Sequence, residues 1–239
     1  RLPIKIQNFH LKFNKKDLRD FSVKKHLGSA PLRDNDYILP PLEIKDQLNS
    51  SICTAVAITA EREWTEQVLL SEEFQYSLTK KIEGRFDTYG ADIYDALKAC
   101  KIGALEKKLS PFSITKDDQK KFGNWTNWPS NLVDSSYIHK AQAYFKADNG
   151  SDLFDSIRMV ILNENRGVIV GAYWQSGWVS NPVIPEYNGP AFKKDNPHAF
   201  RIIGQKTINN AVHLICQNSY GKESGDNGLF YFPRSQVNK

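Results

Sequence analysis

Cys53 is the side chain of this sequence whose position most favours nucleophilic chemistry. It opens a predicted helix over residues 53–70, and the positive end of a helix macrodipole lowers the pKa of a thiol and favours the thiolate. Free cysteine is also among the most buried residue types, so a small packing thiol is the competing interpretation. The other cysteines are Cys100 and Cys216, and an odd total leaves at least one thiol unpaired within the chain.

A thiol nucleophile needs a base, and His198 is the histidine best placed for that role. It opens the strand-like run H-A-F-R-I-I-G after an Asn-Pro step, so its ring is expected at the edge of a lobe. Asn218 follows a second strand-like run, A-V-H-L-I-C-Q, which can pair antiparallel with the first. Its amide oxygen can then accept a hydrogen bond from the imidazole and fix the tautomer, although a turn residue is an equally good interpretation of Asn218.

Gln47 lies six residues before Cys53, in the loop that leads into the predicted helix. There its side-chain amide can join the backbone N–H of Cys53 in binding a developing oxyanion. A glutamine in a loop means nothing by itself, so this role depends on the other three residues acting together.

The elements that must position these side chains differ between the two halves of the chain. The first half has helical spacing of apolar residues, which predicts helices over 53–70, 72–81 and 91–100, with Ser50 and Ser51 as candidate N-caps of the first. The second half predicts a strand at 141–145, a helix over 152–162 and then four short apolar runs. Clusters of Gly, Asn, Pro or Asp separate these runs, which is typical of a mainly antiparallel sheet.

We therefore predict an α+β fold with two lobes that form one unit. The helical lobe spans residues 40–137 and carries Cys53, and the β-rich lobe spans residues 138–239 and carries His198 and Asn218. Residues 1–39 form an N-terminal extension that ends at a stiff Pro-Pro step.

The ordered set of Gln, Cys, His and Asn resembles the papain-like cysteine peptidases. The segments that carry the resemblance are K-D-Q-L-N-S-S-I-C-T-A-V-A, P-H-A-F-R-I-I-G and N-S-Y-G-K-E-S-G-D-N-G-L-F-Y-F. It is most similar to the bacterial and viral branch, in which Cys-Thr-Ala replaces the usual Cys-Trp-Ala, and it extends over about residues 40–232. The family has a helical lobe that presents the cysteine on a central helix. A β-barrel-like lobe presents the histidine and asparagine across a cleft.

The resemblance implies a role for each matching position. Cys53 matches the nucleophile, His198 the general acid/base and Asn218 the residue that orients it, while Gln47 and the Cys53 N–H match the oxyanion hole. Tyr220 stands where a tryptophan usually shields the histidine–asparagine hydrogen bond.

Two further positions match substrate-binding residues of the family, and four depart from its pattern. Gly90 resembles the glycine wall on which an extended substrate pairs, and Ala199 resembles part of the pocket for the second residue before the scissile bond. The departures, which alter the loops around the expected site, are Leu48, Ile52, Pro197 and Ser224.

The resemblance implies a cysteine endopeptidase that hydrolyses peptide bonds of protein or peptide substrates through a thioester acyl-enzyme, with no cofactor and no metal. A catalytically weak or inert binding or structural module is one alternative, motivated by Leu48, Pro197 and Ser224. A transpeptidase or deamidase that uses the same cysteine–histidine pair is another.

Composition narrows the partners. The net charge of +5 is scattered along the chain, so we expect no nucleic-acid partner, and apolar runs of about eight residues are too short for the roughly 20 that cross a bilayer. We expect a soluble monomer. The missing paired-cysteine framework favours a location inside a cell or within a viral particle. The extension is either a surface strap across the two lobes, which we favour, or a pro-segment near the cleft.

Overall fold

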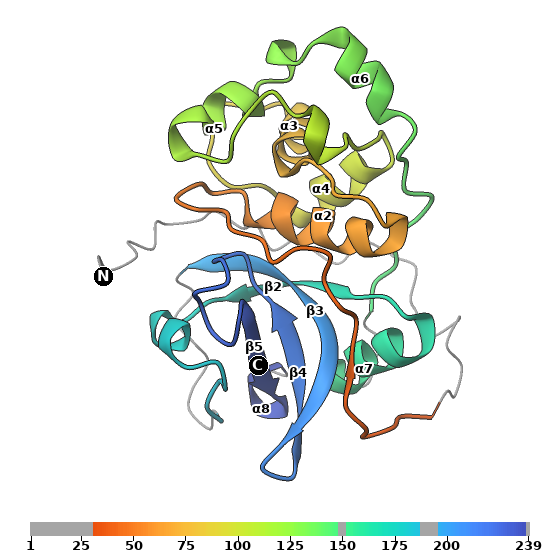
Figure 1. The fold of residues 1–239 in the computed structure, drawn as a ribbon, viewed down its shortest axis with the longest axis vertical. Helices are drawn as coiled ribbons and strands as arrows, with labels where there is room; N and C mark the ends of the chain where they lie inside the picture. The colour runs from red at the N-terminus through yellow and green to blue at the C-terminus, as the bar shows by residue number, and fades with distance from the viewer. Residues whose placement is uncertain (1–30, 148–151, 187–195, 238–239) are drawn as a thin grey trace.

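The computed structural model describes residues 31–147, 152–186 and 196–237, which form two lobes stacked on one another (Figure 1). The helical lobe contains α2 (Cys53–Glu66), α3 (Glu72–Glu83), α4 (Ile93–Cys100), α5 (Lys116–Gly123) and α6 (Ser130–Ser136), with 3-10 turns at Lys107–Leu109 and Trp125–Asn127. The other lobe contains β1 (Tyr37–Ile38), α7 (Leu153–Glu164), β2 (Val168–Tyr173), a 3-10 turn (Ser176–Ser180), β3 (Pro197–Ile208), β4 (Ala211–Gln217), β5 (Leu229–Pro233) and α8 (Arg234–Val237).

Side-chain caps define several of the helix ends. Ser71 accepts from the backbone N–H of Phe74 at the start of α3, and Asp92 accepts from two N–H groups at the start of α4. Gly84 ends α3 in the left-handed conformation, with φ of 65°. The predicted helix over 53–70 ends earlier than expected, at Glu66, because Gln67 adopts φ of 55° and turns its N–H to the carbonyl of Glu63.

The core of the helical lobe is built around α2, α3 and the aromatic residues that follow α5. Its fully buried members include Ile52, Val56, Phe74, Phe122 and Trp128. Three rings interlock edge to face, because Trp128 lies 4.9 Å from Phe74 and 4.8 Å from Phe112. Two of these rings, Phe112 and Trp128, come from residues 110–137, where the sequence pattern predicts no helix or strand.

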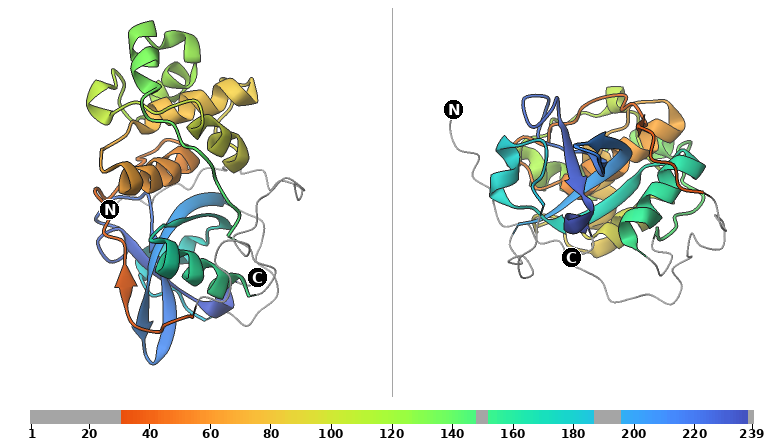
Figure 2. Two further views of the ribbon diagram at one scale, coloured as in Figure 1. Left: turned by 90° about the vertical axis from the view of Figure 1, so that its right-hand side faces the viewer. Right: turned by 90° about the horizontal axis from the view of Figure 1, so that it is seen from below.

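The β-rich lobe is an antiparallel sheet with strand order β1-β3-β4-β5, and β2 pairs with β3 beside β1. Strand β3 is the longest strand and curves across the lobe (Figure 1). Helix α7 packs against this sheet (Figure 2), burying Phe154, Ile157 and Ile161 against apolar residues of β3, β4 and β5. The α+β fold with two lobes is as predicted. The sheet, however, is open within the residues that the structure describes, since β5 does not pair with β1 or β2.

One predicted strand is wrong. Residues 141–145 form no strand. They belong to the segment that connects the helical lobe to the β-rich lobe. The backbone N–H of Ala141 donates to the carbonyl of Cys100, so this N–H is not available to a neighbouring strand. The alternating apolar pattern here reflects a connection between lobes.

Residues 33–39 lie on the β-rich lobe, away from α2. Arg158 and Gln205 both donate to the carbonyl of Arg33, at 2.9 and 2.7 Å, and β1 pairs with β3 at Gln205 and Gly204. A Cβ at Gly204 would lie 2.2 Å from the carbonyl oxygen of Tyr37, so only glycine permits this pairing. The rest of the predicted extension, residues 1–30, lies outside the described residues. In the described parts of the chain, no helix has the length and apolar character that a membrane crossing requires.

Candidate active site

Cys53 is the first residue of α2, at the end of the helix that faces the β-rich lobe. The N-cap position is Ile52, which offers no side-chain acceptor, so the prediction of a serine cap is wrong. The two serines serve the preceding loop instead: the Ser50 hydroxyl donates to the carbonyl of Gln47 at 2.6 Å, and the backbone N–H of Ser51 donates to a side chain of α5. The first turn of α2 is therefore open to another acceptor.

Burial dominates the electrostatics of the Cys53 thiol. Its side chain is 3% exposed and packs against Ala57 and Ala199. This desolvation raises the pKa of Cys53 and outweighs the hydrogen bonds from Ala199 and Thr54, which lower it. The thiol is therefore protonated at neutral pH in this conformation, and the helix terminus alone does not produce the thiolate expected from the sequence.

His198 is buried at the start of β3 with its two ring nitrogens in different environments. Its Nε2 lies 2.7 Å from Oδ1 of Asn218, which accepts a hydrogen bond, so Nε2 carries the proton. Its Nδ1 is buried and has no hydrogen-bond partner among the described residues. Burial lowers the pKa of His198 to about 4, although the bond to Asn218 raises it. The ring is a neutral imidazole whose free Nδ1 lone pair is available as a proton acceptor.

Antiparallel pairing of β3 with β4 brings Asn218 to His198. Arg201 lies opposite Gln217, the last residue of β4, so the residues just beyond this pair meet at the same end of the sheet. Asn218 is held there by a bond from its N–H to the carbonyl of Gly228 at 3.1 Å. The sequence-based expectation that these two strands juxtapose the imidazole and the amide agrees with this geometry.

Two aromatic rings enclose the imidazole. Tyr220 stacks on His198 with ring centroids 4.9 Å apart and planes 17° apart. Trp174 meets the imidazole edge to face at 5.4 Å and is itself 1% exposed. The two rings cover the imidazole, and the shielding of its bond to Asn218 that the resemblance implies for Tyr220 stays a prediction. Trp174 was missed, although it ends the run G-V-I-V-G-A-Y-W and follows Tyr173, which pairs with Pro197.

Gln47 is buried against Ser219, which follows Asn218 in the segment after β4. Its Oε1 accepts from the Ser219 hydroxyl at 2.5 Å and its Nε2 donates to the carbonyl of Ser50 at 2.9 Å. Since these bonds fix the amide orientation, one hydrogen of Nε2 stays free to donate. The next residue, Leu48, adopts φ of 50° and is 60% exposed. A left-handed backbone is strained for a residue that has a Cβ. Leu48 adopts this strained conformation, and its side chain projects into solvent.

Gly90 and Ala199 lie on opposite sides of the α2 N-terminus. Gly90 is buried with φ of 74°, in the loop before α4, and the Thr54 hydroxyl holds this loop by donating to the carbonyl of Ala91 at 3.1 Å. Ala199 is fully buried against Cys53 and Ala57, and its predicted place in a substrate pocket stays a prediction. Of the departures, Pro197 opens β3, where its missing N–H is tolerated, and Ser224 is buried in the turn after Gly221.

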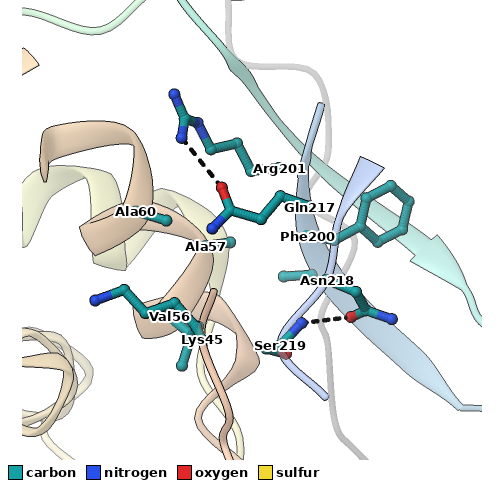
Figure 3. Close-up of a pocket in the computed structure, with 10 residues that line it drawn as sticks. Lys45, Val56, Ala57, Ala60, Phe200, Arg201, Gln217, Asn218 and Ser219 are labelled. Carbon is teal, nitrogen blue, oxygen red and sulfur yellow. Dashed lines mark hydrogen bonds between the residues drawn. The ribbon is translucent and has the colours of Figure 1, made fainter. Parts of the chain in front are cut away.

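A small cavity lies between α2 and the sheet (Figure 3). It is lined by Lys45, Val56, Ala57, Ala60, Ala199, Phe200, Arg201, Gln217, Asn218 and Ser219. Figure 3 shows the bond that Arg201 donates to Gln217, at 3.1 Å. The cavity holds about 10 Å³, too little for a substrate, so it is packing space behind the candidate site. No metal-binding group of three or more His, Cys, Asp or Glu side chains occurs in the parts of the chain that the structure describes.

Comparison with known proteins places the fold. Neither protein-family models nor curated proteins match the sequence. Among solved structures, xylellain, a cysteine protease from Xylella fastidiosa, matches with a TM-score of 0.78 at 23% identity, over 98% of this chain and 92% of xylellain. Digestive procathepsin L2 of Tenebrio molitor matches with a TM-score of 0.73 at 17% identity, over 99% of this chain and 78% of that one. Bromelain of Ananas comosus, solved with the inhibitor E64, matches with a TM-score of 0.63 at 17% identity, over 85% and 93%.

The chain therefore has the papain-like fold, in which the helical lobe meets the antiparallel sheet at the N-terminus of α2. The predicted resemblance is confirmed at the level of fold, and xylellain agrees with its bacterial branch. At these sequence identities, the chemistry rests on the site itself.

Proposed function

We propose that the protein is a cysteine endopeptidase that uses Cys53, His198 and Asn218. The observation that carries the proposal is the state of the imidazole. Its Nε2 is engaged by Asn218, and its Nδ1 is buried without a partner in the described parts of the chain. A fully buried ring nitrogen without a partner costs free energy, and a proton acceptor in a reaction gives it a use. Its location in the fold of known cysteine proteases supports the assignment.

The proposed reaction begins with transfer of the Cys53 proton to Nδ1 of His198. The thiolate attacks the peptide carbonyl carbon, and the oxyanion accepts hydrogen bonds from the Cys53 N–H and from the free hydrogen of Gln47 Nε2. The imidazolium then protonates the leaving amine as the C–N bond breaks, which leaves a thioester on Cys53. A water molecule, deprotonated by the imidazole, hydrolyses the thioester and restores the thiol.

Asn218 keeps the imidazole in the required orientation during both proton transfers. Its Oδ1 accepts from Nε2 and from the Ser219 N–H at 2.8 Å, so the amide cannot turn its nitrogen toward the ring without losing both bonds. The bond to Nε2 strengthens when the ring becomes cationic, which stabilises the imidazolium.

An irreversible epoxide inhibitor of thiol proteases tests the proposal. We expect one adduct per molecule, mapped by mass spectrometry to Cys53, and loss of labelling in Cys53→Ser. Cys100 and Cys216 serve as internal controls: burial raises the pKa of each, as it does for Cys53, so labelling of Cys53 alone would show that its thiol is activated and theirs are not. Labelled protein should also lose cleavage of a denatured-protein substrate.

Two outcomes would overturn the proposal. Absence of an adduct on Cys53 at neutral pH would show an inert module with a papain-like fold. Labelling of Cys53 without cleavage of any peptide in a diverse library would show a different acyl transfer, such as transpeptidation or deamidation.

A further inference from the structure

A chain of buried hydrogen bonds connects the loop before Cys53 with the loop that contains Gly90. The backbone N–H of Ser51 donates to Oε1 of Gln119 at 2.8 Å, and Nε2 of Gln119 donates to the Tyr76 hydroxyl at 2.9 Å. That hydroxyl lies 3.1 Å from the carbonyl oxygen of Thr88 and 3.3 Å from that of Gly90. The two side chains come from α5 and α3, so four separate segments meet in one chain of bonds.

The direction of every bond in this relay is fixed. A backbone N–H can only donate, so the oxygen of Gln119 faces Ser51 and its nitrogen faces Tyr76. The Tyr76 oxygen therefore accepts from Gln119 and directs its single proton to the carbonyls of the Gly90 loop. Burial raises the pKa of Tyr76, so the hydroxyl keeps this proton at neutral pH.

Packing leaves the Tyr76 ring no freedom to move. Tyr76 and Gln119 are each 1% exposed, and Phe122 meets the tyrosine edge to face at 5.8 Å. A Cβ at Gly123 would lie 3.1 Å from the ring, so α5 presents a glycine where it approaches the tyrosine most closely. The hydroxyl is thus held at a defined place relative to both loops.

The rest of the Gly90 loop is tied to α3 by charged groups. The Lys80 ammonium donates to the Thr88 hydroxyl at 3.0 Å and to Glu83 at 2.9 Å. Glu83 in turn accepts from the backbone N–H of Asp92 at 2.7 Å. No disulfide assists, since all three cysteines are free. Of these contacts, only the bonds of Gln119 and Tyr76 continue to the loop that precedes Cys53.

We propose that Gln119 and Tyr76 are positioning residues that set the Gly90 backbone relative to Cys53. The inference rests on the proposed peptidase function, in which Gly90 has the substrate-pairing position that the resemblance implies. A peptide on this wall and a thiol at the α2 N-terminus must have a fixed separation for attack, and a small displacement is costly in rate. The relay contributes to that fixed separation through hydrogen bonds, beside the direct bond from the Thr54 hydroxyl to the Ala91 carbonyl.

The test compares two substrates that share an amino-acid residue at the scissile bond. One is a tetrapeptide with a fluorogenic amide, long enough to reach Gly90, and the other is a single N-acylated amino-acid ester that ends before it. Tyr76→Phe keeps the ring packing and removes only the hydroxyl. With enzyme concentration set by epoxide titration, we expect it to lower kcat/KM for the tetrapeptide about tenfold, mostly through KM, and to leave the ester within about twofold. Gln119→Leu releases the Ser51 loop as well, so both substrates should lose rate.

Thr79→Val is the matched control. Its hydroxyl is buried on the same helix and donates to the carbonyl of Gln75 at 2.8 Å, outside the relay. We expect this variant to have the wild-type kcat/KM on each of the two substrates. Equal losses of kcat/KM on the two substrates in Tyr76→Phe, or no loss on either, would overturn the proposal. A merely structural role would lower the amount of titratable enzyme and leave kcat/KM per titrated site unchanged.

Amide hydrogen exchange tests the relay without any catalysis. Measured by NMR, the Ser51 N–H should exchange at least about tenfold faster in Gln119→Leu than in the wild type, and at an unchanged rate in Thr79→Val. Unchanged Ser51 exchange in Gln119→Leu would show that the relay does not hold this loop. If Cys53 proves inert while Ser51 exchange responds as expected, the peptidase assignment fails and the relay stands.

Discussion

The buried neutral imidazole of His198 predicts that acid destabilises this protein by a defined amount. The ring is fully buried, and its pKa is lowered from 6.5 to about 4 chiefly by that burial. The perturbation is acidification from neutral pH to about pH 4. The unfolded chain binds a proton at this histidine below about pH 6.5, whereas the folded protein binds it only below about pH 4.

The sign and size follow from linkage. Because the unfolded state binds more protons between these two pKa values, the histidine's contribution is fully present above pH 6.5 and is lost as pH falls toward 4. Each pKa unit corresponds to about 1.36 kcal/mol, so the loss amounts to about 3 kcal/mol of unfolding free energy. That is a large fraction of the roughly 5 to 15 kcal/mol that stabilises a typical domain.

Urea denaturation followed by tryptophan fluorescence measures this loss. The control is His198→Gln, in which the side chain can still donate to Asn218 but does not titrate. The pH-dependent contributions of the carboxylates are then the same in both proteins and cancel in the comparison. We expect the difference in unfolding free energy between wild type and variant to change by about 3 kcal/mol between neutral pH and pH 4. Both proteins are measured with the Cys53 thiol reversibly capped, and again uncapped, to prevent and then detect self-cleavage.

Two results would refute the reasoning. A difference that stays constant with pH would mean that His198 titrates alike in both states. A difference of opposite sign in the uncapped protein, with stability lost as pH rises, would mean that a thiolate of Cys53 raises the pKa of the imidazole above 6.5. In that case Cys53→Ala should restore the loss of stability in acid.

Three further substitutions have defined expected outcomes. Asn218→Ala removes the acceptor of the imidazole N–H and should lower kcat/KM by on the order of 10- to 100-fold, with Cys53 still alkylated by the epoxide, as steady-state kinetics and mass spectrometry will show. Lys45→Met removes the nearest cation from the buried Glu63 and Glu72, leaving Glu72 only Lys107 at 3.8 Å, and should cost about 3 to 5 kcal/mol in urea denaturation, while an effect below about 1 kcal/mol would mean that these groups are protonated. Gly204→Ala places a Cβ against the Tyr37 carbonyl and should cost about 1 to 3 kcal/mol and expose residues 31–39 to proteolysis; unchanged cleavage would contradict the pairing.

Local patterns in the sequence were sufficient for the elements that carry the reacting groups. The helical spacing after Cys53 and the two apolar runs beginning at His198 and Ala211 correspond to α2, β3 and β4. Because antiparallel neighbours meet at fixed registers, the pairing of those runs places Asn218 beside His198. Short-range periodicity determines these features, and short-range periodicity is what a single sequence reveals.

Features that depend on long-range hydrogen bonds could not be predicted in this way. Gln119 reaches Ser51 across 68 residues, and no local signal in α5 indicates that its amide is buried. The mistaken N-cap has the same cause, since the hydroxyl of Ser50 is used by the Gln47 loop. Trp174 gave a strand signal, but its contact with the imidazole follows from the register of β2 on β3.

The spacing of the contact residues along α2 matches the spacing of their partners along β3, and this match sets the relative position of the two lobes. From Ala57 to Glu61 the helix rises about 6 Å, and from Ala199 to Arg201 the strand advances about 7 Å. At one end of this contact, Cys53 and Ala57 pack on Ala199, and at the other end Glu61 accepts from Arg201 at 2.7 Å. Two alanines allow the helix to approach the strand closely, and the ion pair prevents it from sliding. Packing of regular elements therefore places Cys53 against Ala199, the residue after His198, and the proposed proton transfer from the thiol to the imidazole rests on this contact.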